Sequence, residues 1–471
     1  MRAVGALIVS LLASGCYGPT VQVGLPCSPE GECPEGQMCA DDGTCQLPGG
    51  GGDGDGGTSG GDATPPDPDA MPIPLESWLT SYELPALERA ADVAEVGGGF
   101  ALVGNNGTVI AIDPRGQIRW QRRLEGVGFL SGVARVTGGM VVVGSSGSGA
   151  AAVMLDHDGD VQWQKTFLDQ TSSFADTVVP LPGGDVMVVA NSDDASDVPS
   201  PWLVRMNPKG EIVEQKRYTL AGGLRVSGGT SAGENGGFVA TGVNEYETDL
   251  EERDMIVFKV DSAGAVSWAK RISGGDNEWG TTASEDFVDG HIAVVGGTWS
   301  DSFGAADMWI VRLDPNGALQ SQHRIGTSSQ DNGLRVRPLG PDGAILVGES
   351  SAGGNTDFVV VEIKNNALTT QFALDADVSL YADGAALTDE GLVLFGDTDA
   401  FGPDIGFFAA GVLAPATLSG CAHTSTPDTD IATSTATSSN ITLTVTTTTA
   451  TAADIDGEVT TPGLSPVFEC Q

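Results

Sequence analysis

The chain has 471 residues, and 22 Lys+Arg against 63 Asp+Glu give a formal net charge of -41 at pH 7. Because this charge repels phosphate backbones, we expect no binding to nucleic acid, and basic patches cannot hold the chain to a membrane. The 67 glycines and the 40% hydrophobic residues are typical of a protein of strands and tight turns, since long helices tolerate little glycine.

The first 15 residues have the features of a cleaved signal peptide. An apolar run over residues 3–12 follows Met1-Arg2, ends in small residues and is too short to span a bilayer. The stretch Leu12-Ala13-Ser14-Gly15-Cys16 resembles the lipobox of bacterial lipoproteins, in which the cysteine is diacylated and becomes the mature N-terminus. The resemblance implies that the membrane is a partner, reached through lipid on Cys16. An ordinary secretory signal, with Cys16 in a disulfide, is the alternative.

The residue after Cys16 bears on localisation. Tyr17 stands where an aspartate often marks retention of such lipoproteins in the inner membrane. The resemblance therefore implies a cell-envelope protein that is lipid-anchored in the outer membrane, on its periplasmic side or surface-exposed.

The segment of residues 16–45 holds most of the cysteines. Cys27, Cys33, Cys39 and Cys45 follow one another at steps of six residues, and in an oxidising compartment such spacing indicates a small disulfide-rich unit. The segment is similar to the Cys-rich knots that follow the lipid anchor in some bacterial surface lipoproteins. Its pairing is open, and a four-thiolate zinc site is the alternative. We expect Cys421 and Cys470 to pair with each other near the C-terminus.

Residues 46–74 are rich in Gly, Asp and Pro and have almost nothing apolar to bury. Such a segment cannot offset the entropy of ordering, so we predict a flexible linker. Its expected role is to hold the folded part clear of the membrane.

An internal repeat decides the fold. A glycine turn leads into an apolar run that ends in a small residue, as in Gly138-Gly139-Met140-Val141-Val142-Val143-Gly144. Successive copies lie 40 to 54 residues apart, which is the size of a four-stranded propeller blade. The seven small residues, called anchors below, are Gly104, Gly144, Ala190, Gly242, Gly296, Gly348 and Gly396.

A second signature completes most repeats. An Asp-x-x-Gly turn leads into a strand with an aromatic residue, as in Asp113 to Trp120, and Asn207 and Asp314 begin copies without the tryptophan. Turns of this composition connect the strands of hairpins, because glycine supplies the positive φ that the turn needs. The tryptophans recur at one structural position, so we expect them to pack between neighbouring blades: Trp120, Trp163 and Trp268.

The two ends of the repeat region complement each other. The seventh repeat lacks its Asp-x-x-Gly strand, whereas residues 75–82 read as a strand without a partner. Pairing the two would close the ring and remove open edges. We therefore predict an all-β fold, a β-propeller of seven four-stranded blades over residues 75–413, closed by an N-terminal strand; an open solenoid is the alternative.

The repeat resembles bacterial β-propeller repeats of the form Gly-Gly-(apolar)-Gly, loop, Asp-x-x-Gly-x-x-x-Trp, with residues 307–317 as the best copy. The resemblance implies the fold and little about function, because propellers host many activities. Residues 111–120 are also similar to the quinone-type (PQQ) propeller repeat, but they lack one residue and a threonine before the glycine. We therefore expect no quinone, and we expect no other cofactor and no metal.

The sequence shows no catalytic motif. Of its four histidines, His157, His291 and His323 occupy unrelated positions of the repeat and His423 lies in the tail. No signature of a metalloprotease, nucleophile elbow or phosphate loop occurs.

Aromatic residues outside the repeat position define a candidate binding face. They fall in acidic connections that open on one face of a propeller, where they could stack on sugars or grip a basic protein. Anchoring of their own loops is the alternative. The candidates are Tyr246, Trp279, Trp299, Phe303 and Phe401.

Residues 414–471 form a Thr/Ser-rich tail without Lys or Arg. We expect either a hairpin clipped by Cys421 and Cys470 or a solvated spacer. Taken together, the sequence predicts a membrane-anchored extracytoplasmic binding module for a protein or glycan partner. An extracytoplasmic hydrolase or lyase that uses the propeller loops is the alternative.

Overall fold

The computed structural model describes most of the repeat region and short strands on either side of it. The described residues are 38–39, 45–46, 78–83, 89–232, 237–244, 253–285, 290–300, 302–339, 343–352, 354–365, 367–374, 379–388, 391–398, 406–412, 424–425, 430–433, 437–440, 444–447, 453–454, 459–460 and 465–470. The predicted signal peptide, Cys16, Cys27, Cys33 and nearly all of the predicted linker lie outside them. No helix among them is long and apolar enough to cross a membrane.

The chain divides into two compact units, residues 1–65 and residues 66–471. In the first unit, β1 (Met38–Cys39) and β2 (Cys45–Gln46) pair antiparallel, and the Cα atoms of Cys39 and Cys45 are register partners.

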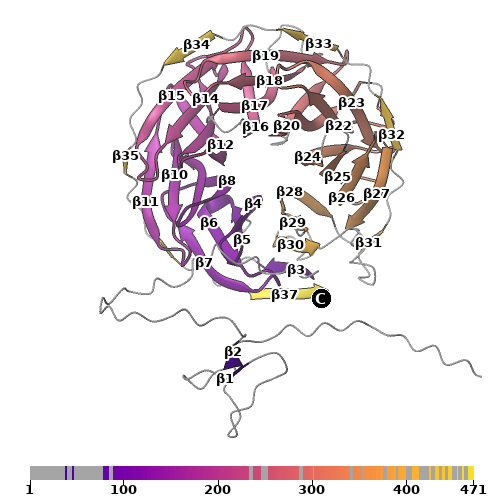
Figure 1. Ribbon diagram of the computed structural model, residues 1–471. Coiled ribbons are helices and arrows are strands. Elements are labelled where there is room, and N and C mark those ends of the chain that lie inside the picture. The colour runs from indigo at the N-terminus through magenta and orange to yellow at the C-terminus, as the bar shows by residue number, and fades with distance from the viewer. Residues whose placement is uncertain are drawn as a thin grey trace, which may run out of the picture. The chain divides into compact units, whose positions relative to one another are not determined.

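The second unit is a ring of seven antiparallel sheets, so the prediction of an all-β propeller with seven four-stranded blades is confirmed (Figure 1). The four strands of each blade are called a, b, c and d from the channel outward. Strands b and c are almost wholly buried. In the order a to d, blade 1 consists of β4 (Ala90–Val96), β5 (Gly99–Gly104), β6 (Thr108–Ile112) and β7 (Ile118–Leu124), with the short helix η2 (Asn105–Gly107) after β5; blade 2 of β8 (Phe129–Val136), β9 (Gly139–Ser146), β10 (Gly149–Leu155) and β11 (Val161–Phe167); and blade 3 of β12 (Ser172–Pro180), β13 (Val186–Asp193), β14 (Pro199–Met206) and β15 (Ile212–Thr219). Blade 4 consists of β16 (Leu224–Ala232), β17 (Gly237–Asn244), β18 (Met255–Val260) and β19 (Val266–Ser273), and blade 5 of β20 (Glu278–Glu285), β21 (Ile292–Thr298), β22 (Asp307–Leu313) and β23 (Leu319–Gly326). Blade 6 consists of β24 (Asp331–Pro338), β25 (Gly343–Ser350), β26 (Asp357–Lys364) and β27 (Ala367–Leu374), and blade 7 of β28 (Leu380–Leu387), β29 (Leu392–Thr398), β30 (Gly406–Val412) and β3 (Trp78–Glu83).

The hydrophobic core lies between the blades. Seven clusters of buried apolar side chains each join two neighbouring blades, for example Val143 of blade 2 with Val188 and Trp202 of blade 3. The continuous apolar runs of strands b and c follow from this arrangement, because both faces of each sheet are covered.

The N-terminal strand closes the ring as predicted. β3 pairs antiparallel with β30 of blade 7, with Trp78 opposite Gly411 and Tyr82 opposite Phe407. Closure in this way leaves no gap between the first and last blades, and one apolar cluster joins residues of both.

Each of the three repeat tryptophans contacts the next blade, which confirms that they pack between blades. The indole Nε1 of Trp120 donates a hydrogen bond of 2.7 Å to the carbonyl oxygen of His157, in the Asp-x-x-Gly turn of the following blade. Trp163 and Trp268 bond in the same way to Pro208 and Pro315, at 3.0 and 3.1 Å.

The aspartate of each Asp-x-x-Gly turn holds the turn together. Asp113 Oδ1 accepts hydrogen bonds from the backbone N–H groups of Arg115 and Gln117, both at 2.9 Å. Asn207 does the same through its amide oxygen at 3.0 Å, which explains why asparagine replaces aspartate there.

The tail differs from the expected hairpin. None of its described strands pairs with another tail strand; each pairs with the outer strand of a blade, because strand d offers an open edge there (Figure 1). These strands are β31 (Thr424–Ser425), β32 (Asp430–Thr433), β33 (Thr437–Asn440), β34 (Thr444–Thr447), β35 (Ala453–Asp454), β36 (Val459–Thr460) and β37 (Ser465–Cys470). Cys421 lies outside the described residues, so its pairing with Cys470 stays a prediction.

Candidate functional site

Every innermost strand carries a β-bulge at the same place. In blade 2, Leu130 pairs with the anchor Gly144 and Gly132 with Val143, so Ser131 is an extra residue without a partner. Bulges re-aim side chains and recur next to functional sites. The seven extra residues form a bulge ring around the channel: Ala91, Ser131, Asp176, Ser227, Thr281, Leu334 and Asp383.

The bulges explain why the anchors are small. A Cβ atom on Gly144 would lie 1.8 Å from the carbonyl oxygen of Phe129, and one on Gly296 would lie 1.8 Å from that of Trp279. Strand a presses its backbone against strand b at the bulge, so glycine is the residue that fits. Blade 3 alone has alanine, Ala190, at this position.

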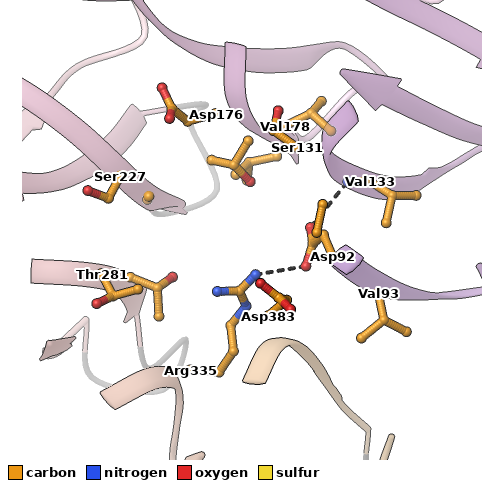
Figure 2. A pocket seen from close by; sticks show the side chains of 16 residues that line it. Asp92, Val93, Ser131, Val133, Asp176, Val178, Ser227, Thr281, Arg335 and Asp383 are labelled. Atoms are coloured by element: carbon orange, nitrogen blue, oxygen red, sulfur yellow. Dashed lines mark hydrogen bonds and ion pairs between the residues drawn. The ribbon is translucent and has the colours of Figure 1, made fainter. Parts of the chain in front are cut away.

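A polar cavity of about 350 Å³ fills the channel at the level of the bulge ring. Side chains from the innermost strands of all seven blades line it (Figure 2). Its charged residues are three aspartates and one arginine, and Ser131, Ser227 and Thr281 add hydroxyl groups.

An ion pair spans the channel. Arg335 Nη2 of blade 6 lies 2.7 Å from Asp92 Oδ1 of blade 1, and Asp92 Oδ2 accepts a hydrogen bond of 3.2 Å from the Val133 N–H of blade 2. Asp92 therefore joins three blades, and its negative charge is neutralised by Arg335.

The other two aspartates are not paired with Arg335 in this way. Asp176 Oδ2 accepts a hydrogen bond of 2.5 Å from the buried amide of Asn191. Asp383 Oδ2 is buried without a hydrogen-bond partner, and burial, with further contributions from nearby Asp397 and Glu349, raises the pKa of Asp383 to about 8. Figure 2 shows the Arg335 guanidinium beside Asp92 and Asp383, with Asp176 on the far side of the cavity.

A second ring lies two positions before each bulge residue and surrounds the mouth of the channel. Phe129 is 48% exposed and Tyr381 is 46% exposed, and the Arg225 guanidinium lies 4.9 Å from the centroid of the Phe174 ring. This mouth ring consists of Arg89, Phe129, Phe174, Arg225, Trp279, Asn332 and Tyr381.

The face with the d–a and b–c connections, called the loop face below, carries most of the exposed apolar side chains in the described part of the chain. Phe129, Leu168, Trp299 and Tyr381 are 42% to 50% exposed there, whereas Val213 and Leu339 lie on the opposite, hairpin face. Scattered exposed apolar residues are common, but Phe129 and Tyr381 lie on innermost strands at the channel mouth, which favours a contact surface there.

The sequence-based candidates fall into different environments. Trp279 belongs to the mouth ring and covers Gly297, where a Cβ atom would meet the indole at 2.1 Å. The Arg324 guanidinium lies 4.7 Å from the centroid of the Phe303 ring, and the Phe303 N–H is bound by Asp307. Trp299 is 50% exposed. Tyr246 and Phe401 lie outside the described residues.

The polar groups of the cavity are engaged by the protein itself in part. Ser131 Oγ lies 2.5 Å from the carbonyl oxygen of Ala175, to which it donates its hydrogen bond, and 3.3 Å from that of Val143. No histidine or cysteine occurs among the described residues that line the cavity. Within the described part of the chain, no group of three or more His, Cys, Asp or Glu residues is placed to hold a metal ion.

Sequence reasoning missed the bulge ring and most of the mouth ring. The signal was indirect: each bulge residue precedes its anchor at a nearly constant spacing, as Ser131 precedes Gly144 and Asp383 precedes Gly396. Without the register, nothing distinguishes these positions from others in an apolar strand.

The fold and the channel define a seven-bladed β-propeller with a polar centre. Residues 76–223 match the family model described as outer membrane protein assembly factor BamB. No curated protein matches the chain. Among solved structures, a protein of unknown function from Bacteroides caccae matches with 14% identity and a TM-score of 0.34, over 62% of this chain and 91% of that one. A D477G ACO/RPE65 chimera matches with 12% identity and a TM-score of 0.36, over 72% and 94%.

Proposed function

We propose that this protein is an extracytoplasmic binding module whose loop face takes up a protein partner with basic side chains. The observation that carries the proposal is the combination of exposed aromatic residues at the channel mouth, such as Phe129 and Tyr381, with aspartates in the channel below. Aromatic rings provide contact area, and carboxylates give electrostatic complementarity to a basic segment.

Two further observations favour a protein over a glycan. Arg225 against Phe174 is an arginine on an aromatic face within the mouth ring itself, and a partner's lysine or arginine could stack on Phe129 or Tyr381 in the same manner. The family model that matches residues 76–223 is described as an assembly factor for outer membrane proteins, which is a protein-directed role.

The proposal includes a lipid anchor at Cys16, supported by the resemblance of residues 12–16 to a lipobox. Two or three acyl chains on one residue attach a protein stably to a membrane, whereas a single myristoyl chain binds only marginally. Labelling with a radioactive fatty acid should mark the wild-type protein and be lost in Cys16→Ala; labelling that persists in the variant would contradict the anchor.

Titration calorimetry of the full chain with a short oligolysine peptide tests the binding site. At pH 9, where the Asp383 carboxyl has lost its proton, we expect binding that weakens as salt is added. At that pH the Kd should rise about tenfold in Asp176→Asn/Asp383→Asn, which corresponds to about 1.4 kcal/mol. The charge-matched control is Asp261→Asn/Asp314→Asn on the hairpin face. These two aspartates hold Asp-x-x-Gly turns, and Asn207 holds the equivalent turn of blade 3, so asparagine should maintain both turns.

Equal loss of affinity in the two double variants would contradict the site, because it would reflect net charge alone. A glycan array provides the other outcome. A neutral glycan that binds and is lost in Phe129→Ala/Tyr381→Ala would assign the face to sugars and overturn the protein partner.

A further inference from the structure

The tail runs once around the outside of the propeller, against the order of the blades. β31 pairs with β27 of blade 6, and β32, β33, β34, β35 and β36 follow on blades 5, 4, 3, 2 and 1. β37 then pairs with β3 of blade 7. Figure 1 shows these short strands at the periphery of the ring. Each blade therefore has a fifth, outermost strand that comes from residues 424–470.

The pairing has the same direction on every blade. All seven tail strands run antiparallel to strand d, and on blades 1 to 6 they pair with its end nearest the loop face, as Thr447 to Thr444 do with residues 216–219. The same pairing on seven blades indicates that the outer edges bind the tail, because a solvated spacer would not pair with each edge in turn.

Blade 7 is where the two ends of the propeller unit meet. β3 pairs with β30 on one side, and on the other side with β37, where Leu79 lies opposite Cys470 and Glu83 opposite Ser465. β3 would be an edge strand without β37, and the tail makes it an interior strand. β3 is also the first described strand after the predicted linker, so a pull on the N-terminus would reach it first.

Charge complements the backbone pairing. Strand d of blades 1 to 5 contains nine Lys and Arg residues, whereas the tail contains six Asp and Glu and no Lys or Arg. Lys165 and Asp454 are direct register partners. Oppositely charged residues at facing positions of antiparallel strands favour that pairing.

We propose that residues 414–471 act as an intramolecular β-strand ligand, a belt that occupies the seven outer edges. Unpaired edges with long strands are where a second copy of the chain, or a strand of another protein, would add. The belt closes the rim to such pairing and fastens β3, and it leaves the two faces for a partner. This role is independent of the function proposed for the loop face.

Hydrogen exchange followed by mass spectrometry tests the belt in the full chain. Val445→Pro/Thr446→Pro removes two N–H groups from β34, opposite Tyr218 and Arg217. We expect amide exchange in residues 212–219 to become at least about tenfold faster, which corresponds to a fall of about 1.4 kcal/mol in the local opening free energy. The faster exchange is confined to these residues if the belt opens locally, and it extends to all seven outer strands if the belt detaches as a whole. The matched control is Thr449→Pro/Ala450→Pro, between β34 and β35, which should leave residues 212–219 as in the wild type.

Exchange in residues 212–219 that is the same in all three proteins would overturn the proposal. A chain that ends at residue 413 gives a second measurement. Faster exchange in the outer strands, with or without self-association, supports the belt. A monomer whose outer strands exchange as they do in the full chain overturns it.

Discussion

The indole Nε1 of Trp78 donates a hydrogen bond of 2.8 Å to the carbonyl oxygen of Pro114, which places the first strand of the propeller unit against the first Asp-x-x-Gly turn. The same bond joins Trp120 to His157 one blade further on. A Cβ atom on Gly116 would lie 2.7 Å from the Trp78 ring, as one on Gly159 would lie 2.8 Å from Trp120. β3 is thus a displaced copy of strand d, and the junction that closes the ring is built like the others.

Loss of the Trp78 side chain should therefore open the ring. Trp78 is 1% exposed, so we expect Trp78→Ala to lower the free energy of unfolding by about 3–5 kcal/mol, and Trp78→Phe to lower it by about 1–2 kcal/mol through loss of the hydrogen bond. Denaturant unfolding measures both. Deletion of residues 75–84 with unchanged stability would contradict closure by the N-terminal strand.

The six glycine anchors should tolerate no side chain at the bulge. Gly296→Ala would place a Cβ atom 1.8 Å from the Trp279 carbonyl oxygen, and we expect a loss of about 1–3 kcal/mol in the free energy of unfolding. Gly128→Ala is the control, because its Cβ atom would meet its nearest neighbour, the Ser145 carbonyl oxygen, at 3.9 Å. Thermal unfolding that shifts equally in both variants would argue against the steric account.

Asp383 should make the protein less stable as the pH rises. Its pKa is raised by burial from 3.8 to about 8, so the folded state retains the proton that the unfolded state loses. Stability associated with this group is present below pH 4 and is lost as the pH rises through 8. We expect Asp383→Asn, which stays neutral, to gain roughly 2–5 kcal/mol over the wild type between pH 4 and pH 8, since each pH unit contributes up to about 1.4 kcal/mol.

Urea unfolding at several pH values measures this difference. Asp158→Asn is the control, because it removes the same charge from an exposed turn. A constant difference between Asp383→Asn and the wild type from pH 4 to pH 8 would show that the Asp383 carboxyl is ionised throughout.

The register of β1 and β2 predicts one disulfide of the Cys-rich segment. Residues directly opposite each other on antiparallel strands have Cα atoms about 4.5–5.5 Å apart, within the range that a disulfide bridges. Because Cys39 is opposite Cys45, we expect these two to be linked, which leaves Cys27 to pair with Cys33. Peptide mapping without reduction would identify the pairs, and four free thiols with bound zinc would favour the metal site instead.

The sequence predicted those features of the fold that depend on local chemistry. Gly144 and the other anchors marked strand b, Trp120 marked strand d, and the unpartnered residues 75–82 indicated closure. The bulge ring was not predictable, because whether Ser131 or Asp383 enters the channel depends on a one-residue slip between two strands. The path of the tail was not predictable either. Short Thr-rich strands have little periodicity of their own, and the edges that order them become available only once the blades exist.

Site-specific photo-crosslinking in the cell envelope tests the central claim most directly. A benzoylphenylalanine at Phe129 or Tyr381 on the loop face, or at Val213 or Leu339 on the hairpin face, replaces a residue that is already 43% to 56% exposed. We expect crosslinks to a partner protein from the first two positions and none from the last two. Crosslinks that form equally from both faces, or from the hairpin face alone, would contradict that claim.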